Sequence, residues 1–334
     1  MVEERNLKAG RVCLHGKGGA RRANVIGRLT LYALTVFMVS AVFLVPMTYL
    51  WLVAVQWPGW FDLARRAVLS ASLASGCTLF VALFIFHRHM VPDRDQKYYP
   101  TDGCKVHVAL TAYNDEVCIA EAVRGFQSKH VDQLIVVENN SHDQTKQEAR
   151  DAGATVVTET TPGYGACCMR ALAEAAEGMQ DTDIIILCEG DLTFVAADIP
   201  KFLAYIENAD LVLGTRATQE LRQTRTQMDW LINPANQIVA KMIQARFWGT
   251  RLTDVGCTYR AIRVNAYRML RQELHVTGNH FSPHMLIEAL KMGMCVLEIP
   301  IVFKRRGGLS KGVGSDKIKA ARVAIQMLGL LYRA

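Results

Sequence analysis

Residues 184–191 read IIILCEGD, a run of four aliphatic side chains that ends, after Cys188, in two carboxylates flanking a glycine. A short apolar run of this kind is typical of a strand that is buried on both faces of a sheet. Carboxylates one residue apart at the end of such a strand can bind a hard divalent cation, which in turn binds phosphate oxygens. Because an acidic pair in a turn is by itself more often solvated, the neighbouring sequence has to decide between the two interpretations.

The same pattern recurs on both sides of this stretch. Apolar runs alternate with segments whose apolar residues have helical spacing, the runs lying at 106–110, 134–137, 155–157, 184–187 and 211–214 and the segments at 119–127, 145–152, 166–177 and 199–207. This alternation predicts an α/β domain with a mostly parallel sheet and helices on both faces. Ligands of such sheets bind at the carboxyl ends of the strands, so we expect the residues that follow each run to form a site.

Composition and charge exclude several classes of protein. Hydrophobic residues make up 51% of the 334 residues and charged residues 21%, which excludes a disordered, collagen-like or coiled-coil chain. The net charge of +7 is uneven, because residues 1–28 carry +5, residues 304–334 carry +7, and the middle carries −5. Basic ends favour anionic lipid or phosphate partners, and nucleic acid is not expected because no RRM, KH or zinc-finger motif accompanies the charge. Nine scattered cysteines without a CxxC pair favour reduced thiols in a cytosolic setting.

Two uncharged stretches near the N-terminus account for the hydrophobic excess. Residues 29–57 and 67–86 each lack a charged side chain and exceed or match the ~20 residues that cross a bilayer. The short link at 58–66 predicts an antiparallel transmembrane hairpin. By the positive-inside rule the basic residues 1–28 stay in the cytoplasm, and two crossings return the chain there. We therefore expect a multi-pass protein of the cell membrane with its remaining part in the cytoplasm; buried helices of a soluble core and a signal peptide fit less well.

Seven segments carry a resemblance to a known family. In chain order they are LTAYND (110–115), VENNSHD (137–143), GYGA (163–166), EGD (189–191), DLVLGTR (210–216), TDVGCTYR (253–260) and RRGGLSK (305–311). Their order and spacing resemble the polyprenyl-phosphate glycosyltransferases of family 2, an inverting group that includes the dolichol-phosphate mannose and glucose synthases. The resemblance covers residues 104–312. It implies a GT-A nucleotide-diphospho-sugar transferase fold, hexosyltransferase activity, a nucleotide-diphospho-sugar donor, a polyprenyl phosphate acceptor, and Mg²⁺ or Mn²⁺ as cofactor.

The resemblance also implies roles for individual residues. Those expected to bind the nucleotide sugar are Thr111, Tyr113, Asp115, Glu138, Asn139, Gly163, Gly165 and Glu189. Those expected to hold the metal are Glu189, Asp191 and Thr193. Those expected to act in catalysis are Asp191, Arg216, Arg305 and Lys311. Those expected to bind the acceptor phosphate are Arg216, Asp254, Arg260, Arg305, Ser310 and Lys311.

Several of these positions depart from the family's pattern. Thr111 replaces a proline, Asp115 replaces a glutamate, and Glu138 and Asn139 replace two aspartates, which leaves the base of the nucleotide open between uracil and guanine. Glu189 replaces the first aspartate of the Asp-x-Asp motif and keeps its charge on a longer arm, so metal binding is expected with altered geometry.

The expected chemistry follows from the charges. Transfer of a sugar leaves negative charge on the departing diphosphate, which a cation held by the 189–191 carboxylates would stabilise. A lipid phosphate is already an anion and needs little or no general base, but cations such as Arg216, Arg260, Arg305 and Lys311 must offset the repulsion between the phosphates. If the acceptor were a hydroxyl of a lipid or glycan, Asp254 or His284 would be candidate bases. An inactive nucleotide-sugar-binding scaffold at the membrane is the alternative outside the enzymes.

The expected organisation has four parts. They are a basic cytoplasmic tail (1–28), the transmembrane hairpin (29–90), the catalytic domain (100–312) and a C-terminal amphipathic helix at the membrane (313–334). A second apolar segment at 228–248 either lies in the headgroup layer or packs against the sheet. We leave open whether the chain forms a homo-oligomer.

Overall fold

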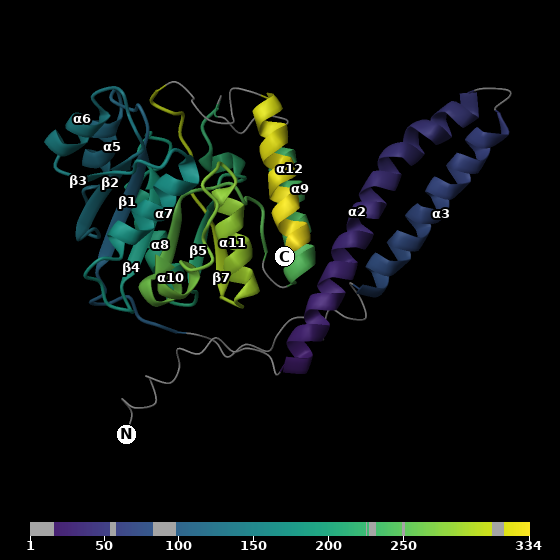
Figure 1. Cartoon of the computed structure of the whole chain (residues 1–334), viewed down its shortest axis with the longest axis horizontal. Helices are drawn as coiled ribbons and strands as arrows, with labels where there is room; N and C mark the ends of the chain where they lie inside the picture. Colours follow the sequence, from purple (N-terminus) through teal and green to yellow (C-terminus); the bar gives the residue numbers. More distant parts are fainter. Residues whose placement is uncertain are drawn as a thin grey trace. The chain divides into compact units, whose positions relative to one another are not determined.

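The computed structural model describes residues 17–53, 58–82, 98–224, 226, 232–248, 251–308 and 317–334. The chain forms two compact units, Met1–Arg94 with Met242–Thr250 and Asp95–Lys241 with Arg251–Ala334. Figure 1 shows an α/β unit around a sheet and a unit dominated by two long helices.

A seven-stranded sheet organises the larger unit. Its strands are β1 (Val106–Ala112), β2 (Gln133–Glu138), β3 (Thr155–Thr158), β4 (Ile184–Glu189), β5 (Leu211–Thr215), β6 (Arg260–Arg263) and β7 (Val296–Pro300). Their order across the sheet is β3-β2-β1-β4-β6-β5-β7. All seven residues of β1 are buried, as expected of a central strand covered on both faces. The five predicted strands are confirmed, whereas β6 and β7 were not anticipated from the sequence.

Strand β6 makes the sheet mixed. It pairs antiparallel with both β4 and β5, while all other pairs of neighbouring strands are parallel. The antiparallel direction of β6 follows from the position of the segment that precedes it. Asp254 binds Arg216 just beyond the carboxyl end of β5, so the strand that follows starts at the carboxyl edge and has to run back. The predicted mostly parallel sheet is therefore confirmed with one reversed strand.

Helices cover both faces of the sheet. The four predicted helices are confirmed to within two residues as α5 (Ile119–Phe126), α6 (Thr145–Asp151), α7 (Tyr164–Ala175) and α8 (Ile199–Ile206). The remaining described helices of eight or more residues in or entering this unit are α9 (Ile232–Phe247), α11 (Phe281–Lys291) and α12 (Lys317–Arg333), and the shorter elements are η2 (Ala196–Asp198), η3 (Gln219–Leu221) and α10 (Val264–Leu270). Helix α12 falls inside the predicted C-terminal helix and packs against α11.

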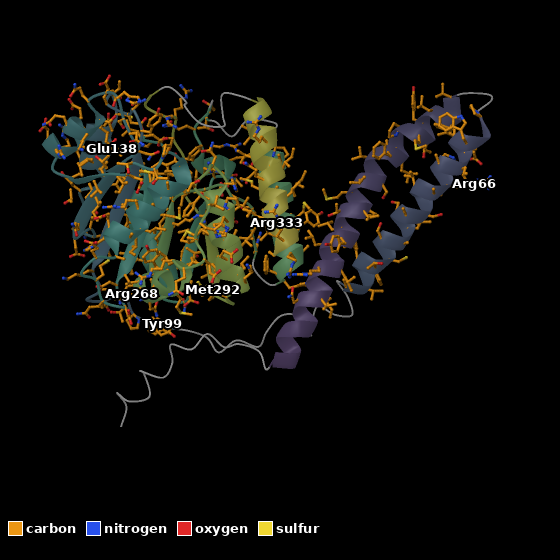
Figure 2. The ribbon with its side chains drawn as sticks, viewed as in Figure 1. Arg66, Tyr99, Glu138, Arg268, Met292 and Arg333 are labelled. Atoms are coloured by element: carbon orange, nitrogen blue, oxygen red, sulfur yellow. The ribbon has the colours of Figure 1, made fainter. Side chains whose placement is uncertain are left out.

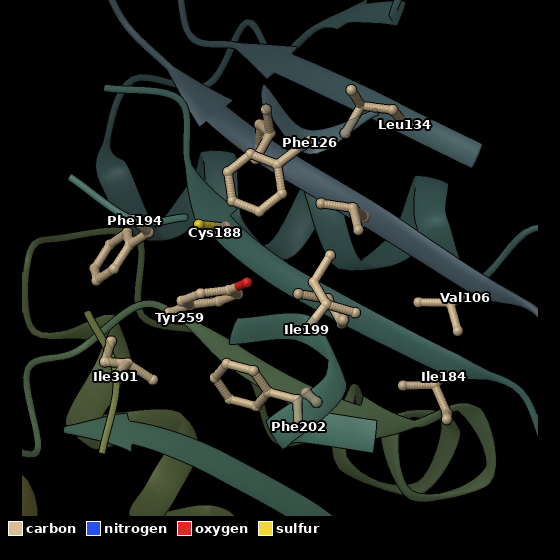
Figure 3. Close-up of a cluster of buried hydrophobic side chains, with 14 of the residues drawn as sticks. Val106, Phe126, Leu134, Ile184, Cys188, Phe194, Ile199, Phe202, Tyr259 and Ile301 are labelled. Carbon is tan, nitrogen blue, oxygen red and sulfur yellow. The ribbon is translucent and has the colours of Figure 1, made fainter. Parts of the chain in front are cut away.

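An aromatic cluster fills the core between the sheet and α8. Tyr259 is fully buried, and its ring lies 4.5 Å from that of Phe202, 5.3 Å from Phe194 and 6.1 Å from Phe126 (Figure 3). Its hydroxyl donates a hydrogen bond of 3.0 Å to the carbonyl oxygen of Val195, which satisfies the only polar atom of the side chain. The cluster fixes the segment that enters β6 against the loop that follows β4.

Two helices form most of the smaller unit. Helix α2 (Lys17–Val53) and helix α3 (Gly59–Val81) pack side by side as an antiparallel pair. Within α2, residues Asn24–Val53 form the one described helical segment that is long and apolar enough to cross a membrane, with a mean hydropathy of 2.1. The predicted second span, 67–86, is described only as far as residue 82, so the transmembrane hairpin stays a prediction.

The glycine turn before α7 supplies a test of the packing. A Cβ on Gly165 would come within 2.1 Å of the carbonyl oxygen of Val276, a backbone atom that cannot move aside. We expect Gly165→Ala to lower the free energy of unfolding by about 2–4 kcal/mol, seen as a fall of about 5 °C or more in the melting temperature. Gly125→Ala is the matched control, because nothing lies within 4 Å of its Cβ and alanine favours helix α5. Equal melting temperatures for the two variants would contradict the close approach of the two backbones at Gly165.

Candidate active site

A cavity of about 730 Å³ opens at the carboxyl edge of the sheet, within the range of small-molecule sites. Seven residues predicted to bind the donor or metal line it: Thr111, Tyr113, Asp115, Asn139, Gly163, Glu189 and Asp191. The lining is completed by Ala112, Asn140, His142, Thr160, Pro162, Tyr164, Cys167, Asn279 and Arg306. Motifs from the ends of four parallel strands, β1 to β4, thus meet at one site, as the α/β pattern predicted.

Hydrogen bonds between side chains and backbone amides connect the loops after β1 and β2. Asn114 has a left-handed backbone with φ of 50°, and its side-chain oxygen accepts a 2.7 Å hydrogen bond from the amide of His142. In return Ser141 Oγ accepts a 3.1 Å hydrogen bond from the amide of Asn114. Asp115 is buried, and one of its oxygens accepts a 3.1 Å hydrogen bond from the amide of Tyr113. This network presents the Asp115 carboxylate to the cavity.

Asn139 fixes the glycine turn that forms another wall. Its amide group donates to the carbonyl oxygens of Glu159 and Thr161 at 2.9 and 2.7 Å, and its oxygen accepts a 2.9 Å hydrogen bond from the amide of Gly163. Gly163 has φ of 130°, a conformation that L side chains rarely adopt. An asparagine suits this position better than an aspartate because only an amide can donate these two hydrogen bonds.

Two predicted donor-site residues, Glu138 and Gly165, lie behind the cavity lining. One carboxylate oxygen of Glu138 accepts a 2.8 Å hydrogen bond from the amide of Ser141, and Gly165 packs on the loop at Val276. Figure 2 shows Glu138 near the carboxyl end of β2. Both residues therefore support the walls of the cavity, and we assign them no direct contact with the donor.

Asp191 is the most deeply buried acid of the cavity, with 1% of its surface exposed. Its Oδ1 accepts hydrogen bonds from the amide and the hydroxyl of Thr193, a geometry made by the left-handed backbone of Leu192 at φ of 67°. Its Oδ2 makes no hydrogen bond with the residues that the structure describes and lies 3.4 Å from Nη1 of Arg306. Burial, and then the charge of Glu189, raise the pKa of Asp191 to about 6, which Arg306 counteracts.

The donor set fits a divalent cation that also binds phosphate. Within the described part of the chain, no group of three or more His, Cys, Asp or Glu side chains is arranged to hold a metal alone. Mg²⁺, however, typically uses one or two carboxylates together with substrate phosphates and water. The half-buried Glu189 and Oδ2 of Asp191, which makes no hydrogen bond among the described residues, satisfy that requirement. Thr193, predicted as a ligand, instead donates its hydroxyl to Asp191 and orients that carboxylate.

The basic loop after β7 contributes Arg306 to the cavity, whereas the sequence pointed to Arg305. Nη2 of Arg306 lies 3.2 Å from Asp115, so its guanidinium group bridges Asp115 and Asp191. The exposed Arg305 instead donates from Nε to the carbonyl oxygen of Thr224 at 2.7 Å. The arginine of this loop whose guanidinium group lines the cavity is therefore Arg306 and not the predicted Arg305. Ser310 and Lys311, the other predicted residues of this loop, lie outside the described residues.

Arg216 and Asp254 form a buried ion pair. Arg216 donates to the Asp254 carboxylate from Nε at 2.7 Å and from Nη2 at 2.8 Å, and the side chain of Asn236 donates to it at 2.6 Å. Burial alone would raise the pKa of Asp254, but the charge and hydrogen bonds of Arg216 outweigh it and lower that pKa. Asp254 is fully buried and engaged, so the structure assigns it neither phosphate binding nor base catalysis.

Two further predicted residues are placed in the interior. Arg260 is 1% exposed and donates to the carbonyl oxygens of Val255, Cys257 and Ser282, so we remove it from the acceptor-binding set. His284, the alternative base, is fully buried on α11, and its Nε2 lies 3.1 Å from the carbonyl oxygen of Glu273. Both side chains lie beside backbone carbonyl oxygens, as expected because buried polar groups need hydrogen-bond partners.

Comparison with known proteins agrees with this geometry. The model of Glycosyl transferase family 2 matches residues 107–271. Protein RfbJ of Shigella flexneri is 31% identical over 114 residues, which are 33% of this chain and 84% of that protein. This chain belongs to glycosyltransferase family 2. It is therefore an enzyme that transfers a glycosyl group.

Other relatives of this glycosyltransferase come from Haloferax volcanii. Its dolichyl-phosphate hexose transferase is 27% identical over 212 residues, covering 61% of this chain and 85% of that protein. Its glycosyltransferase AglJ is 26% identical over 202 residues, covering 60% of this chain but only 63% of AglJ. A solved glucosyl-3-phosphoglycerate synthase from Mycobacterium tuberculosis, in complex with Mn²⁺, UDP-glucose and glycerol 3-phosphate, superposes with a TM-score of 0.52 at 17% identity, over 69% of this chain and 80% of that one. That likeness supports the predicted GT-A-like fold.

Sequence reasoning missed three residues around the carboxylates of the glycosyltransferase: Arg306, Tyr164 and Thr258. The first is one position from the predicted Arg305, and the second stands between the two predicted glycines. The hydroxyls of Tyr164 and Thr258 both contact Oε1 of Glu189. All three residues were contained in the quoted motifs, but the direction in which each side chain points could not be read from the sequence.

The buried ion pair yields a second test. Asp254→Asn leaves Arg216 buried without a countercharge, and we expect the free energy of unfolding to fall by about 3–5 kcal/mol at pH 7. Asp181→Asn is the control, because Asp181 is 67% exposed and pairs with Arg268 at the opposite end of the sheet (Figure 2), where an ion pair contributes about 1 kcal/mol or less.

The pH dependence of this difference has a defined sign. The pKa of Asp254 is lower in the folded than in the unfolded chain, so its contribution to stability is present at neutral pH and is lost as the pH falls below about 4. Denaturation of the wild type and Asp254→Asn should therefore converge on acidification. A gap in stability that stays constant from pH 7 to pH 3 would contradict this ion pair.

Proposed function

We propose that this glycosyltransferase moves a hexose from a nucleotide diphosphate sugar to a polyprenyl phosphate at the cytoplasmic face of a membrane. The observation that carries the proposal is the cluster of Glu189, Asp191 and Arg306 in a cavity lined by donor-binding motifs. Two carboxylates and an arginine suit a reaction in which two phosphorylated substrates meet. The printed name of the Haloferax dolichyl-phosphate hexose transferase supports a polyprenyl acceptor.

The residues of the chain divide the work by charge. We propose that Glu189 and Asp191 hold Mg²⁺ or Mn²⁺, which when bound supplies positive charge to the departing diphosphate. Thr111, Tyr113, Asp115, Asn139 and Gly163 would shape the pocket for the nucleotide. Arg306 would release part of its contact with Asp115 and Asp191 and meet phosphate oxygens through its fork of donors.

The proposed acceptor site lies in the basic loop after β7. We propose that Ser310 and Lys311 continue the basic loop beyond Arg306 and bind the acceptor phosphate. Two donors of the Arg216 side chain bind the Asp254 carboxylate, so they are not available for a bidentate phosphate contact. We propose that Arg216 holds the end of β5 in place and acts on the phosphates only through the electrostatic potential of its charge. A backbone hydrogen bond between the basic loop and the loop after β4 favours this arrangement: the amide of Gly307 donates to the carbonyl oxygen of Asp191 at 2.9 Å.

The burial of the alternative bases favours a phosphate acceptor over a hydroxyl acceptor. Transfer to a lipid or glycan hydroxyl needs a general base within hydrogen-bond reach of the proton. Asp254 and His284, the two candidates from the sequence, are both fully buried, and Asp254 is in addition paired with Arg216. A lipid phosphate brings its own negative charge and needs no such base. An inactive scaffold is disfavoured because the carboxylate pair and Arg306 are intact.

We further propose that residues 29–90 form a transmembrane hairpin between a cytoplasmic basic tail (1–28) and a cytoplasmic catalytic domain (100–312). The apolar segment Asn24–Val53 supports the first crossing. The arginines and lysines of residues 1–28 support the orientation. Helix α12 would lie at the membrane surface as an amphipathic element.

A product assay tests the proposed function directly. We expect the purified full chain in detergent, with Mn²⁺ or Mg²⁺, to convert polyprenyl phosphate and one member of a panel of UDP- and GDP-hexoses into a hexosyl phosphate lipid, identified by mass. The Asp191→Asn variant should lose at least ~100-fold in rate. A product formed only on a hydroxyl acceptor, or no product with any donor, would refute the proposal.

Adjacent arginines provide a sharper comparison. We expect Arg306→Gln to lower kcat/KM for transfer by ~100-fold, about 2.7 kcal/mol, because glutamine keeps hydrogen bonding but removes the charge between the two carboxylates. Arg305→Gln should change transfer less than ~5-fold, since the described partners of its guanidinium group are the backbone carbonyl and hydroxyl of Thr224. A larger loss in Arg305→Gln than in Arg306→Gln would return the phosphate contact to Arg305.

A further inference from the structure

Glu189 is held by two hydroxyl groups, those of Tyr164 and Thr258, to which the sequence motifs assigned no role. Its Oε1 accepts a 2.6 Å hydrogen bond from Oγ1 of Thr258 and a 3.1 Å hydrogen bond from the hydroxyl of Tyr164. The two hydroxyls also contact each other directly. A glutamate has one more rotatable bond than the aspartate of the family's motif, so its carboxylate needs more restraint to occupy one position. These contacts supply that restraint.

Thr258 reaches Glu189 because of the reversed strand. In the antiparallel pair of β4 and β6, Ile184 faces Arg263 and Leu187 faces Arg260. Continuing this register by two residues places Thr258 opposite Glu189. Thr258 is itself 1% exposed, so its hydroxyl is shielded from water and strongly oriented. The clamp on Glu189 is therefore a direct consequence of the register of the sheet.

Tyr164 reaches the same oxygen from helix α7. It is the first residue of α7, and the glycines on either side of it are held by hydrogen bonds from their backbone amides. The amide of Gly163 donates to Asn139 at 2.9 Å, and the amide of Gly165 donates to the carbonyl oxygen of Thr277 at 2.7 Å. The phenol ring is thus carried on a rigid turn, as a positioning group requires.

The hydrogen bonds of this cluster reach only one oxygen of Glu189. An ionised carboxylate can only accept hydrogen bonds, so the hydroxyls of Thr258 and Tyr164 are the donors to Oε1. Among the described residues, none makes a hydrogen bond to Oε2 of Glu189. The carboxylate therefore has one oxygen tied to the protein and one free to face the cavity that Asp191 also lines.

We propose that Tyr164 and Thr258 are positioning residues that fix Glu189 so that its second oxygen completes the cation site with Asp191. The inference rests on the proposed function, in which these carboxylates hold Mg²⁺ or Mn²⁺. It assigns the longer glutamate arm a specific geometry: the hydroxyl clamp takes up the extra length. Partners of metal ligands in other proteins influence metal affinity by 10–100-fold, and we expect about 10-fold here.

Binding of Mn²⁺ to the full chain in detergent tests the clamp without relying on turnover. Mn²⁺ is titrated in the presence of UDP, and in parallel GDP, and free Mn²⁺ is followed by electron paramagnetic resonance. We expect Tyr164→Phe and Thr258→Val each to raise the Kd for Mn²⁺ about 10-fold, while Thr258→Ser, which keeps the hydroxyl, stays within about 2-fold of wild type. Tyr205→Phe, an exposed tyrosine on α8, is the unaffected control.

A double-mutant cycle separates the clamp from general damage to the fold. The shorter arm of Glu189→Asp withdraws the carboxylate from the hydroxyls, so adding Tyr164→Phe to it should weaken Mn²⁺ binding by less than about 2-fold more. Unchanged Mn²⁺ affinity in Tyr164→Phe and Thr258→Val, with wild type binding Mn²⁺ and forming product, would overturn the clamp and leave the proposed function standing. A wild type that binds no Mn²⁺ with either nucleotide would overturn the proposed metal site together with the clamp.

Discussion

Negative charge buried at the carboxyl edge of the sheet sets the main demand on this structure. A carboxylate removed from water must find countercharge or donors, or its burial costs several kcal/mol. Asp115 and Asp191 share Arg306, which comes from the loop after the last strand. Asp254 takes two donors from Arg216, at the end of a different strand. Loops that are far apart in the chain are therefore held at one edge by charge, and the cavity exists between them.

The reversed strand β6 connects this charge pattern to the rest of the fold. Because β6 begins at the carboxyl edge, the segment that leads into it delivers Asp254 to β5 and Thr258 to β4 within five residues. Tyr259, the next residue, points into the aromatic core between Phe194 and Phe202. One short segment thus serves the ion pair, the clamp on Glu189 and the core. A shift of one residue in register would exchange these roles, since neighbouring side chains in a strand face opposite sides.

The sequence predicted much of this protein and failed at identifiable places. Apolar runs were sufficient for the five predicted strands. Burial leaves a clear pattern in composition in β1, β2, β4 and β5, which are buried over most of their length, whereas the edge strand β3 is partly exposed. Strand β6 begins and ends with arginine, so its burial could not be inferred; Arg260 and Arg263 satisfy their charges through backbone carbonyl oxygens. The motifs correctly indicated most residues lining the cavity. They named Arg305 for Arg306 because a linear motif does not determine which of two adjacent side chains turns inward.

By itself, the sequence determined the alternation of strands and helices, the uncharged N-terminal stretches, and the acidic pair that ends β4, all of which follow from local composition and spacing. Only the tertiary structure decided which distant groups meet that pair. The amides of Lys304 and Gly307 bond to the loop after β4, while the amide of Arg305 bonds to Gln223, so adjacent residues of the basic loop face opposite ways. Such orientations depend on strand register and on the neutralisation of buried charge, which are properties of the assembled chain and not of any single segment.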